Sequence, residues 1–334
     1  MMISQDIAVP HFEDVRQAAQ RIKGLAFRTP LLGSPVLDDK LGFRLRIKAE
    51  SLQRTGSFKF RGAYNRISQL EPAEHPGGVV AFSSGNHGQG VAAAAALCSL
   101  PAVVVMPADT PQIKLRNVAG YGAEVVTFNR ASEDREAIAR TIAQERRAVI
   151  VPPYDDADII AGQGTVGLEI IEQAQADGLT IDHVVAPASG GGLIAGIALA
   201  IEQLSPGSKI WTAEPAGFDD HARSFASGRR EANDAVTGSI CDALMARTPG
   251  VITFAVNQPR LAGGLAVSDD EVRHAMAVAF DILKLVIEPG GAVALAALLT
   301  GKLDVAAGET VVVVASGGNV ERRTFAEALE HRGL

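Results

Sequence analysis

The chain has 334 residues, 47% of them hydrophobic, and a formal net charge of −7. This predicts a soluble globular protein with two domains or one two-lobed domain, and without a basic face for nucleic acid. No apolar run of about 18 residues suggests a membrane span, the acidic N-terminus lacks the features of a secretory signal, and two distant cysteines predict neither disulfides nor a zinc site. We expect a cytoplasmic protein.

The first chemical signal along the chain is TGSFKFRGA, residues 55–63, in which Lys59 stands between two phenylalanines. Burial beside aromatic rings disfavours the charged ammonium, lowers the pKa of a lysine and leaves a nucleophilic amine. The alternative is an exposed lysine next to core residues, because most lysines are exposed. The sequence around Lys59 does not by itself decide between the two.

Beyond residue 79, short β-branched runs alternate with alanine-rich helical stretches. Strands are predicted over 78–84, 102–107, 123–128, 147–153, 183–189, 209–215 and 309–318, with helices over 88–97, 112–120, 132–147, 161–174 and 193–204. This alternation indicates parallel sheets covered by helices on both sides. Residues 215–265 lack a clean period and predict irregular surface with short helices, and Ser268 with Glu271 forms the capping box of a later helix.

A glycine-rich turn, PASGGGLIAG, joins the strand over 183–189 to the helix over 193–204. The amides of Gly190, Gly191 and Gly192 can converge on an anion at the positive end of the helix, which predicts a phosphate seat. The alternative is the dinucleotide site of an NAD(P)-dependent oxidoreductase, with Glu214 on the ribose. That alternative lacks the G-x-G-x-x-G spacing and leaves the aromatic-flanked lysine without a role.

Two further polar turns follow predicted strands. In SSGNHGQG, the side chains of Ser83, Ser84 and Asn86 and the amides around Gly85 form a helix start suited to a carboxylate. In ASGGN, Ser316 places a hydroxyl at the carboxyl end of a strand, where open α/β sheets bind ligands. Together with the phosphate seat and the lysine, these turns predict an aldehyde cofactor with a phosphate tail.

The order of these motifs resembles the fold-type II pyridoxal 5′-phosphate enzymes, in the group of serine/threonine dehydratases, serine racemases and 3-hydroxyaspartate dehydratases. The resemblance extends over nearly the whole chain, through RTPLLGS, ESLQRTGSFKFRGA, SSGNHGQG, IAGQGT, SGGGLIAG, AEP, IEPGGA and SGGN. It implies a two-lobed α/β fold, similar to the tryptophan synthase β chain, with parallel sheets flanked by helices. The large cofactor-binding domain is expected at 1–70 and 152–334, and the small domain at 71–151.

The resemblance also implies roles around the cofactor. Lys59 carries the Schiff base to the cofactor aldehyde, Phe58 packs beside the ring, and Asn86 bonds the ring hydroxyl. Ser316 faces the pyridine nitrogen, where a neutral hydroxyl makes the ring a milder electron sink and favours β-elimination over transamination. The phosphate loop consists of Ser189, Gly190, Gly191, Gly192 and Leu193, and many relatives have a fourth glycine in place of Ser189.

The implied reaction converts a small β-hydroxy amino acid, with L-serine or L-threonine expected first, to a 2-oxo acid and ammonia. Lys59 is the expected general base. Serine racemase and L-threo-3-hydroxyaspartate dehydratase are the alternatives within the family. Substrate contacts are expected from Ser83, Ser84, Gly85, Asn86, His87 and Arg135.

Three residues bear on the choice within the family. Ser84 is a second catalytic candidate, as a base on the opposite face that would permit racemisation, or else it only binds the carboxylate or caps the helix. Arg135, in the first turn of a helix starting near Ser132, either binds a substrate carboxylate or pairs with acidic neighbours on the surface. Tyr154 stands where racemases often have asparagine, which favours a dehydratase.

A divalent cation and a second subunit complete the expectations. Glu214, Asp220 and a carbonyl near Phe218 resemble the Mg²⁺, Mn²⁺ or Ca²⁺ site of the racemase-like branch, and such oxygen ligands suit hard cations. The alternative is a solvated acidic turn. Relatives usually form dimers, so a homodimer is expected.

Overall fold

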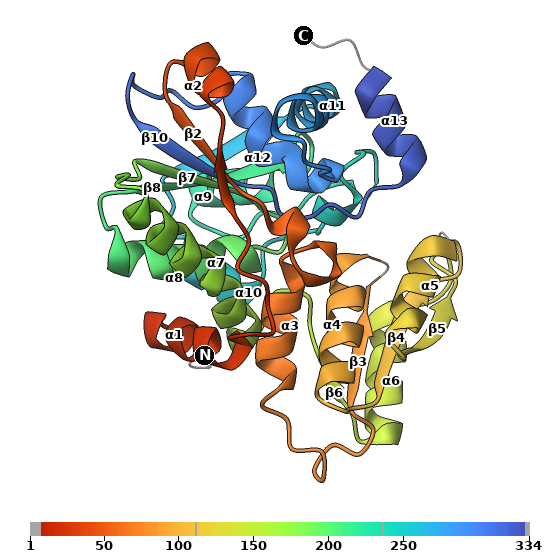
Figure 1. The fold of residues 1–334 in the computed structure, drawn as a ribbon. Coiled ribbons are helices and arrows are strands. Elements are labelled where there is room, and N and C mark those ends of the chain that lie inside the picture. Colours follow the sequence, from red (N-terminus) through yellow and green to blue (C-terminus); the bar gives the residue numbers. More distant parts are fainter. Residues whose placement is uncertain (1–7, 84, 111, 236, 331–334) are drawn as a thin grey trace.

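The computed structural model describes residues 8–83, 85–110, 112–235 and 237–330. Its strands form two sheets, a larger one in the order β1-β2-β10-β7-β8-β9 and a smaller one in the order β5-β4-β3-β6 (Figure 1). The strands are β1 (Leu31–Gly33), β2 (Arg44–Lys48), β3 (Val79–Phe82), β4 (Ala102–Pro107), β5 (Glu124–Phe128), β6 (Val149–Ile150), β7 (His183–Pro187), β8 (Lys209–Pro215), β9 (Gly263–Val267) and β10 (Thr310–Val314).

Helices cover both sheets. They are α1 (Phe12–Ile22), α2 (Pro35–Leu41), α3 (Lys59–Ile67), α4 (Asn86–Leu97), α5 (Gln112–Gly120), α6 (Arg135–Arg146), α7 (Ala157–Ala176), α8 (Gly192–Leu204), α9 (Asp220–Ser227), α10 (Val251–Asn257), α11 (Asp269–Val278), α12 (Pro289–Leu299) and α13 (Arg322–Glu330). Short turns of helix are η1 (Glu50–Leu52), η2 (Arg54–Gly56), η3 (Asp242–Leu244) and the π-helical η4 (Ala279–Leu283). No helix in the described part of the chain is both long and apolar enough to cross a bilayer.

The predicted fold class, parallel sheets flanked by helices, is confirmed with one departure. Within the larger sheet β1 pairs antiparallel with β2, whereas β2, β10, β7, β8 and β9 run parallel. The smaller sheet is parallel and its strands fall between residues 79 and 150. The domain boundaries at 70/71 and 151/152 stay a prediction.

Consecutive valines form strands here because both faces of each sheet are buried. In β10, Val311 and Val313 enter one apolar cluster, whereas Val312 and Val314 enter another on the opposite face. A strand alternates its side chains between faces, so an unbroken apolar run indicates helices on both sides. Figure 1 shows such layers, with α12 and α8 on different sides of the larger sheet.

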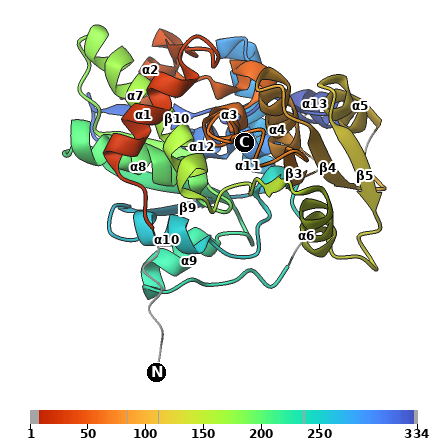
Figure 2. The same cartoon turned by 90° about the horizontal axis from the view of Figure 1, so that it is seen from below.

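Helix α3, which begins at Lys59, lies between the two sheets and packs against α4 and α7. Figures 1 and 2 both place it where the smaller sheet, with α4 to α6, meets the larger one. The irregular segment 215–265 contains α9, η3, α10 and one strand that the sequence did not predict, β9. The capping box is confirmed, because Glu271 N donates to Ser268 Oγ and Ser268 N donates to Glu271 Oε2.

Candidate active site

The predicted cofactor residues line one cavity where the two sheets meet. Its walls include Phe58, Lys59, Ser83, Gly85, Asn86, His87, Arg135, Ser189, Gly190, Gly191, Gly192, Leu193 and Ser316. Apart from Arg135, which begins α6, these residues follow β3, β7 and β10 at their carboxyl ends or stand at the start of α3. Ligands of open α/β sheets bind at such ends. Ser84 lies outside the described residues.

Lys59 is the cavity's amine. Its Nζ donates a hydrogen bond of 2.6 Å to the carbonyl of Pro153 and lies 5.0 Å from the centre of the Phe58 ring. Burial lowers the pKa of Lys59 to about 8. At pH 7 about a tenth of such an amine is uncharged, far more than for a free lysine. The structure therefore supports the nucleophilic lysine, half-buried and with a desolvated amine, over the exposed one.

In the turn between β7 and α8, the backbone carbonyls are hydrogen-bonded, whereas two of the backbone amides are free. The carbonyls of Ser189, Gly190 and Gly191 accept hydrogen bonds from His221, Thr253 and Asn257, respectively. Among the described residues, the amides of Gly190 and Gly191 have no acceptor. Free amides at the start of a helix can bind an anion, and the phosphate seat at the start of α8 stays a prediction.

Close neighbours explain why glycines occupy this turn. Gly191 has a φ of +91°, which favours glycine, and a Cβ there would lie 2.5 Å from the His221 ring. A Cβ at Gly190 would overlap the ring of Tyr154. The hydroxyl of Ser189 accepts a hydrogen bond from Ala246 N at 3.1 Å. A serine thus fits where many relatives have a fourth glycine.

The turn after β3 presents side chains rather than only amides. Ser83 Oγ accepts from Gly85 N at 3.2 Å, and Asn86 begins α4. His87 is buried and its Nε2 donates to the Val151 carbonyl at 2.8 Å. Burial, and next the charge of Lys59, lower the pKa of His87 to about 3, so the imidazole is neutral. His87 can therefore offer polarity to a substrate but no charge.

The last polar turn, after β10, contacts the lysine-bearing segment through its backbone. Phe58 N donates to the Ser316 carbonyl at 3.1 Å, and Ser57 forms a β-bridge with Gly317. Ser316 is only 5% exposed yet lines the cavity. These contacts hold the predicted partner of the ring nitrogen beside the lysine.

Arg135 lines the cavity, and its contact with a substrate stays a prediction. Helix α6 begins at Arg135 and its N-cap is Asp134, so the predicted start near Ser132 is wrong by three residues. The Asp134 carboxylate accepts from Glu136 N and Ala137 N, which caps the N-terminus of the helix there. In the described part of the chain no carboxylate pairs with Arg135, whose guanidinium lies 5.6 Å from the centre of the Phe82 ring.

The predicted metal residues lie outside this cavity. Glu214 and Asp220 are fully buried and Phe218 is 3% exposed, so the solvated acidic turn is wrong. Glu214 accepts from His221 N and Ala222 N, and Asp220 accepts from Asn233 Nδ2, but Asp220 Oδ2 is buried without a partner. No cluster of three or more His, Cys, Asp or Glu side chains suited to a metal occurs among the described residues.

The surroundings of both carboxyls favour their protonated forms. Burial, and then the neighbouring Asp220, raise the pKa of Glu214 well above its usual range. Burial also raises the pKa of Asp220 to about 6. Two buried carboxyls close enough to repel need protons or a cation at neutral pH.

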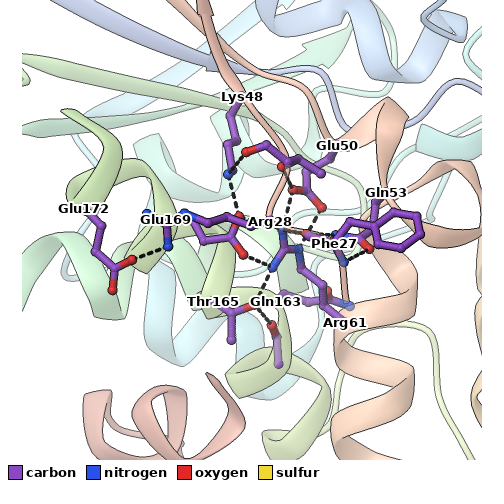
Figure 3. Close-up of polar contacts among 12 residues, drawn as sticks. Phe27, Arg28, Lys48, Glu50, Gln53, Arg61, Gln163, Thr165, Glu169 and Glu172 are labelled. Atoms are coloured by element: carbon purple, nitrogen blue, oxygen red, sulfur yellow. Dashed lines mark hydrogen bonds and ion pairs between the residues drawn. The ribbon is translucent and has the colours of Figure 1, made fainter. Parts of the chain in front are cut away.

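A buried ionic cluster anchors the first turn of α3 (Figure 3). Arg61, two residues after Lys59, donates from Nε and Nη2 to both oxygens of Glu50, each at 2.8 Å, and from Nη1 to Glu169 at 2.7 Å. Lys48 Nζ donates to Glu169 at 2.6 Å. Two cations and two carboxylates balance in charge, so α3 is tied to β2, η1 and α7 without a net buried charge.

Comparison with known proteins is consistent with this geometry. Residues 22–317 match the family described as pyridoxal-phosphate dependent enzyme. The chain belongs to this family. It is 41% identical over 318 residues to an L-threo-3-hydroxyaspartate ammonia-lyase of Saccharomyces cerevisiae, covering 95% of this chain and 96% of that protein. It is 38% identical to a catabolic L-threonine dehydratase of Escherichia coli (strain K12), covering 96% of each.

The solved structures agree with both the family and the fold. A maize serine racemase superposes with a TM-score of 0.89 and 37% identity, covering 96% of this chain and 97% of that one. The predicted family and its fold class are therefore confirmed, and the dinucleotide alternative is set aside. The family supports pyridoxal phosphate as the cofactor, and the half-buried lysine and the free glycine amides of the cavity fit this cofactor.

Several residues of the cavity had no role predicted from the sequence. Lys114, Glu288 and Asn319 line the cavity, and Tyr154 covers the glycine turn. Glu288 and Asn319 belong to the motifs IEPGGA and SGGN, so the signal was present in the sequence. Only the fold shows that these motifs meet.

Proposed function

We propose that this protein converts a small β-hydroxy amino acid to a 2-oxo acid and ammonia, using pyridoxal phosphate. The substrate first loses water. Hydrolysis of the dehydrated product then releases the 2-oxo acid and ammonia. The observation that carries the proposal is the buried Lys59 amine, with its pKa lowered to about 8, in the same cavity as the unbonded amides of Gly190 and Gly191. The cofactor's amine chemistry and its phosphate each have a partner there.

The chain's own residues divide the work. When bound, pyridoxal phosphate condenses with amines and makes the α-proton of an amino acid acidic. Lys59 would hold the aldehyde and then accept that proton at Nζ, while the turn from Ser189 to Leu193 would hold the phosphate. Phe58 and Ser316 would border the ring, and Asn86 would contact its hydroxyl.

Arg135 favours 3-hydroxyaspartate over serine and threonine, which the sequence put first. Its guanidinium reaches the cavity and has no carboxylate partner among the described residues. A substrate with a second carboxylate would supply one, and the yeast relative at 41% identity is named for this substrate. Serine and threonine remain the second candidates, because neither Lys114 nor Arg135 excludes a substrate whose β-carbon carries no carboxylate.

Replacing Arg135 with alanine is expected to raise KM for L-threo-3-hydroxyaspartate about 10- to 100-fold, because a charge-assisted hydrogen bond is lost. KM for L-serine should change less than about threefold, since serine lacks the second carboxylate. Arg140→Ala is the matched control, because Arg140 lies on the same helix and pairs outward with Asp134 and Glu136. Equal effects of Arg135→Ala on both substrates would remove the specificity role.

Racemase activity is the other candidate within the family. At the position of Tyr154, whose ring packs on Gly190, the racemases often have asparagine. Ser84, the proposed second base, lies outside the described residues, so its role stays a prediction. Measurement of D-serine formed from L-serine, beside keto acid release, separates the two activities.

We further propose a divalent cation held by Glu214, Asp220 and the Phe218 carbonyl. The buried, unpartnered Asp220 Oδ2 and the raised pKa values of both carboxyls support it. Oxygen ligands of this kind suit Mg²⁺, Mn²⁺ or Ca²⁺. The cation would neutralise both carboxyls, of which Glu214 caps α9, and would thereby stabilise the region next to the glycine turn, since His221 of α9 bonds Ser189.

Chelation with EDTA is expected to make stability depend on pH. Without a cation, the raised pKa of Asp220 has a consequence for the stability of the folded protein. The contribution of Asp220 to that stability is fully present below about pH 4 and is lost as the pH rises through about 6. The thermal midpoint of the chelated protein should therefore fall between about pH 4 and pH 6, by the order of a few degrees, and recover with Mg²⁺ or Ca²⁺.

Asp220→Asn tests the site itself, with exposed Asp234→Asn as its control. The first variant should lose the response to added cation and the second should retain it. An unchanged response in Asp220→Asn would contradict the metal assignment. The homodimer and the cytoplasmic location stay predictions, and light scattering of the purified protein tests the first.

A further inference from the structure

Four motifs meet in one chain of hydrogen bonds beside the cavity. Asn319 Nδ2 donates to the Thr55 carbonyl at 2.7 Å and to Asn86 Oδ1 at 2.8 Å. Asn86 Nδ2 in turn donates to Glu288 Oε1 at 2.5 Å. The chain therefore runs from the lysine-bearing segment, through the turn after β10, to the start of α4 and the start of α12.

The direction of this chain is fixed by its backbone end. A carbonyl can only accept, so the Asn319 atom that faces Thr55 must be the amide nitrogen. The same nitrogen faces Asn86, which sets the carbonyl side of the Asn86 amide toward Asn319. The amide nitrogen of Asn86 must then face Glu288, and Glu288 Oε1 must accept.

The backbone around the chain is built to hold it. Thr55 has a φ of +67°, a left-handed conformation that is uncommon for threonine, and this conformation orients its carbonyl. A Cβ at Gly317 would overlap Glu288 Oε1, and one at Gly56 would lie 2.6 Å from Asn319 Oδ1. Glycines at both positions leave room for the two side chains.

We propose that Asn319 and Glu288 are positioning residues that fix the orientation of the Asn86 amide and so decide how the cofactor ring is held. The proposal rests on the proposed function, in which Asn86 contacts the ring hydroxyl. Neither residue needs to touch the cofactor for this role. Both act by pinning the two ends of one amide, which otherwise could rotate and exchange its donor and acceptor sides.

The state of Glu288 agrees with a role as acceptor. Burial, and then Asp242, raise the pKa of Glu288 to about 8, whereas Asn86 and Lys114 oppose the shift. The thiol of Cys241 is the other titratable group coupled to it. A neutral carboxylic acid that accepts through Oε1 has the shape of a glutamine amide, so Glu288→Gln preserves the contact.

Three variants and a control separate this proposal from a general structural role. Asn319→Asp leaves a carboxylate without hydrogens facing two acceptors, Glu288→Ala removes the acceptor, and Glu288→Gln keeps it. Glu321→Gln is the control, because Glu321 lies half-exposed at the neighbouring hollow. Each protein is titrated with pyridoxal phosphate, and the absorption band of the bound cofactor is recorded with the affinity.

Asn319→Asp and Glu288→Ala should weaken cofactor binding about 10- to 100-fold and shift the absorption band, since a buried polar atom loses its partner. Glu288→Gln and Glu321→Gln should stay within about threefold of the unmodified protein. Unchanged affinity and spectrum in Asn319→Asp, or a Glu288→Gln variant as impaired as Glu288→Ala, would overturn the proposal.

A readout without cofactor keeps the two proposals apart. The side-chain amide signals of Asn86 in the cofactor-free protein should be protected from solvent exchange, and Asn319→Asp should remove that protection. If the unmodified protein binds no pyridoxal phosphate, the proposed function fails while this measurement still tests the hydrogen-bond chain. Free exchange of the Asn86 amide in the unmodified protein would overturn the chain itself.

Discussion

Replacing Lys59 with alanine is expected to lower kcat for the elimination reaction by at least about 10⁴-fold, the upper range for loss of a general acid–base group. The variant should also lose the visible absorption of a cofactor bound covalently to the protein. The reason is that Lys59 is the amine at the cavity floor, with its Nζ on the Pro153 carbonyl and a pKa lowered to about 8 by burial. Both losses come from one atom.

Lys114→Ala is the matched control for Lys59→Ala. Lys114 lines the same cavity, but its Nζ pairs with the Asp242 carboxylate at 3.0 Å, whereas Lys59 Nζ bonds a backbone carbonyl. The control should keep the absorption band of the bound cofactor. A Lys59→Ala protein with full turnover and an unchanged band, or a Lys114→Ala protein that loses the band, would show that the wrong lysine has been assigned.

Replacing Glu50 with alanine is expected to destabilise the protein by about 3–5 kcal/mol, because it leaves part of a buried charge without its partner. Arg61 and Glu50 are fully buried, and Glu50 accepts two hydrogen bonds from that guanidinium (Figure 3). Although burial alone would raise it, Arg61 holds the pKa of Glu50 below its usual value. Urea unfolding followed by the fluorescence of the chain's single tryptophan, Trp211, measures the loss.

Glu172→Ala provides the comparison for Glu50→Ala. Glu172 pairs with Arg28 at the edge of the same cluster, but both side chains are 54% exposed. An exposed pair of this kind contributes about 0–1 kcal/mol to stability. The variant should therefore unfold at nearly the same urea concentration as the unmodified protein. Equal stability of the Glu50→Ala and Glu172→Ala variants would contradict the view that the buried cluster anchors α3.

The larger part of the fold was predictable because its strands are buried on both faces. Runs such as the valines of β10 cannot belong to a half-exposed sheet, and the helices between them had to be crossovers. The strands β1, β2 and β9 were not predicted. β1 has 3 residues and β9 begins with two glycines, so neither shows a β-branched run. β2 alternates charged with apolar residues and shows no such run either.

Residues that line the cavity were predictable from motifs, but the contacts between motifs were not. Gly190 and Lys59 each suggested a task from local sequence, and the structure brings both to one cavity. The pairing of Asn86 with Glu288 joins residues 202 positions apart, which no local pattern reveals. The burial of Glu214 likewise depends on how α9 folds back over the end of β8, and spacing alone could not separate it from a solvated turn.

The most direct test of the central claim is to reduce the protein with borohydride after incubation with pyridoxal phosphate, digest it and locate the added mass by mass spectrometry. We predict one modified peptide, with the pyridoxyl group fixed on Lys59 and the other lysines unmodified. Unmodified Lys59 in fully loaded protein, or the group attached instead to Lys114, would contradict the account.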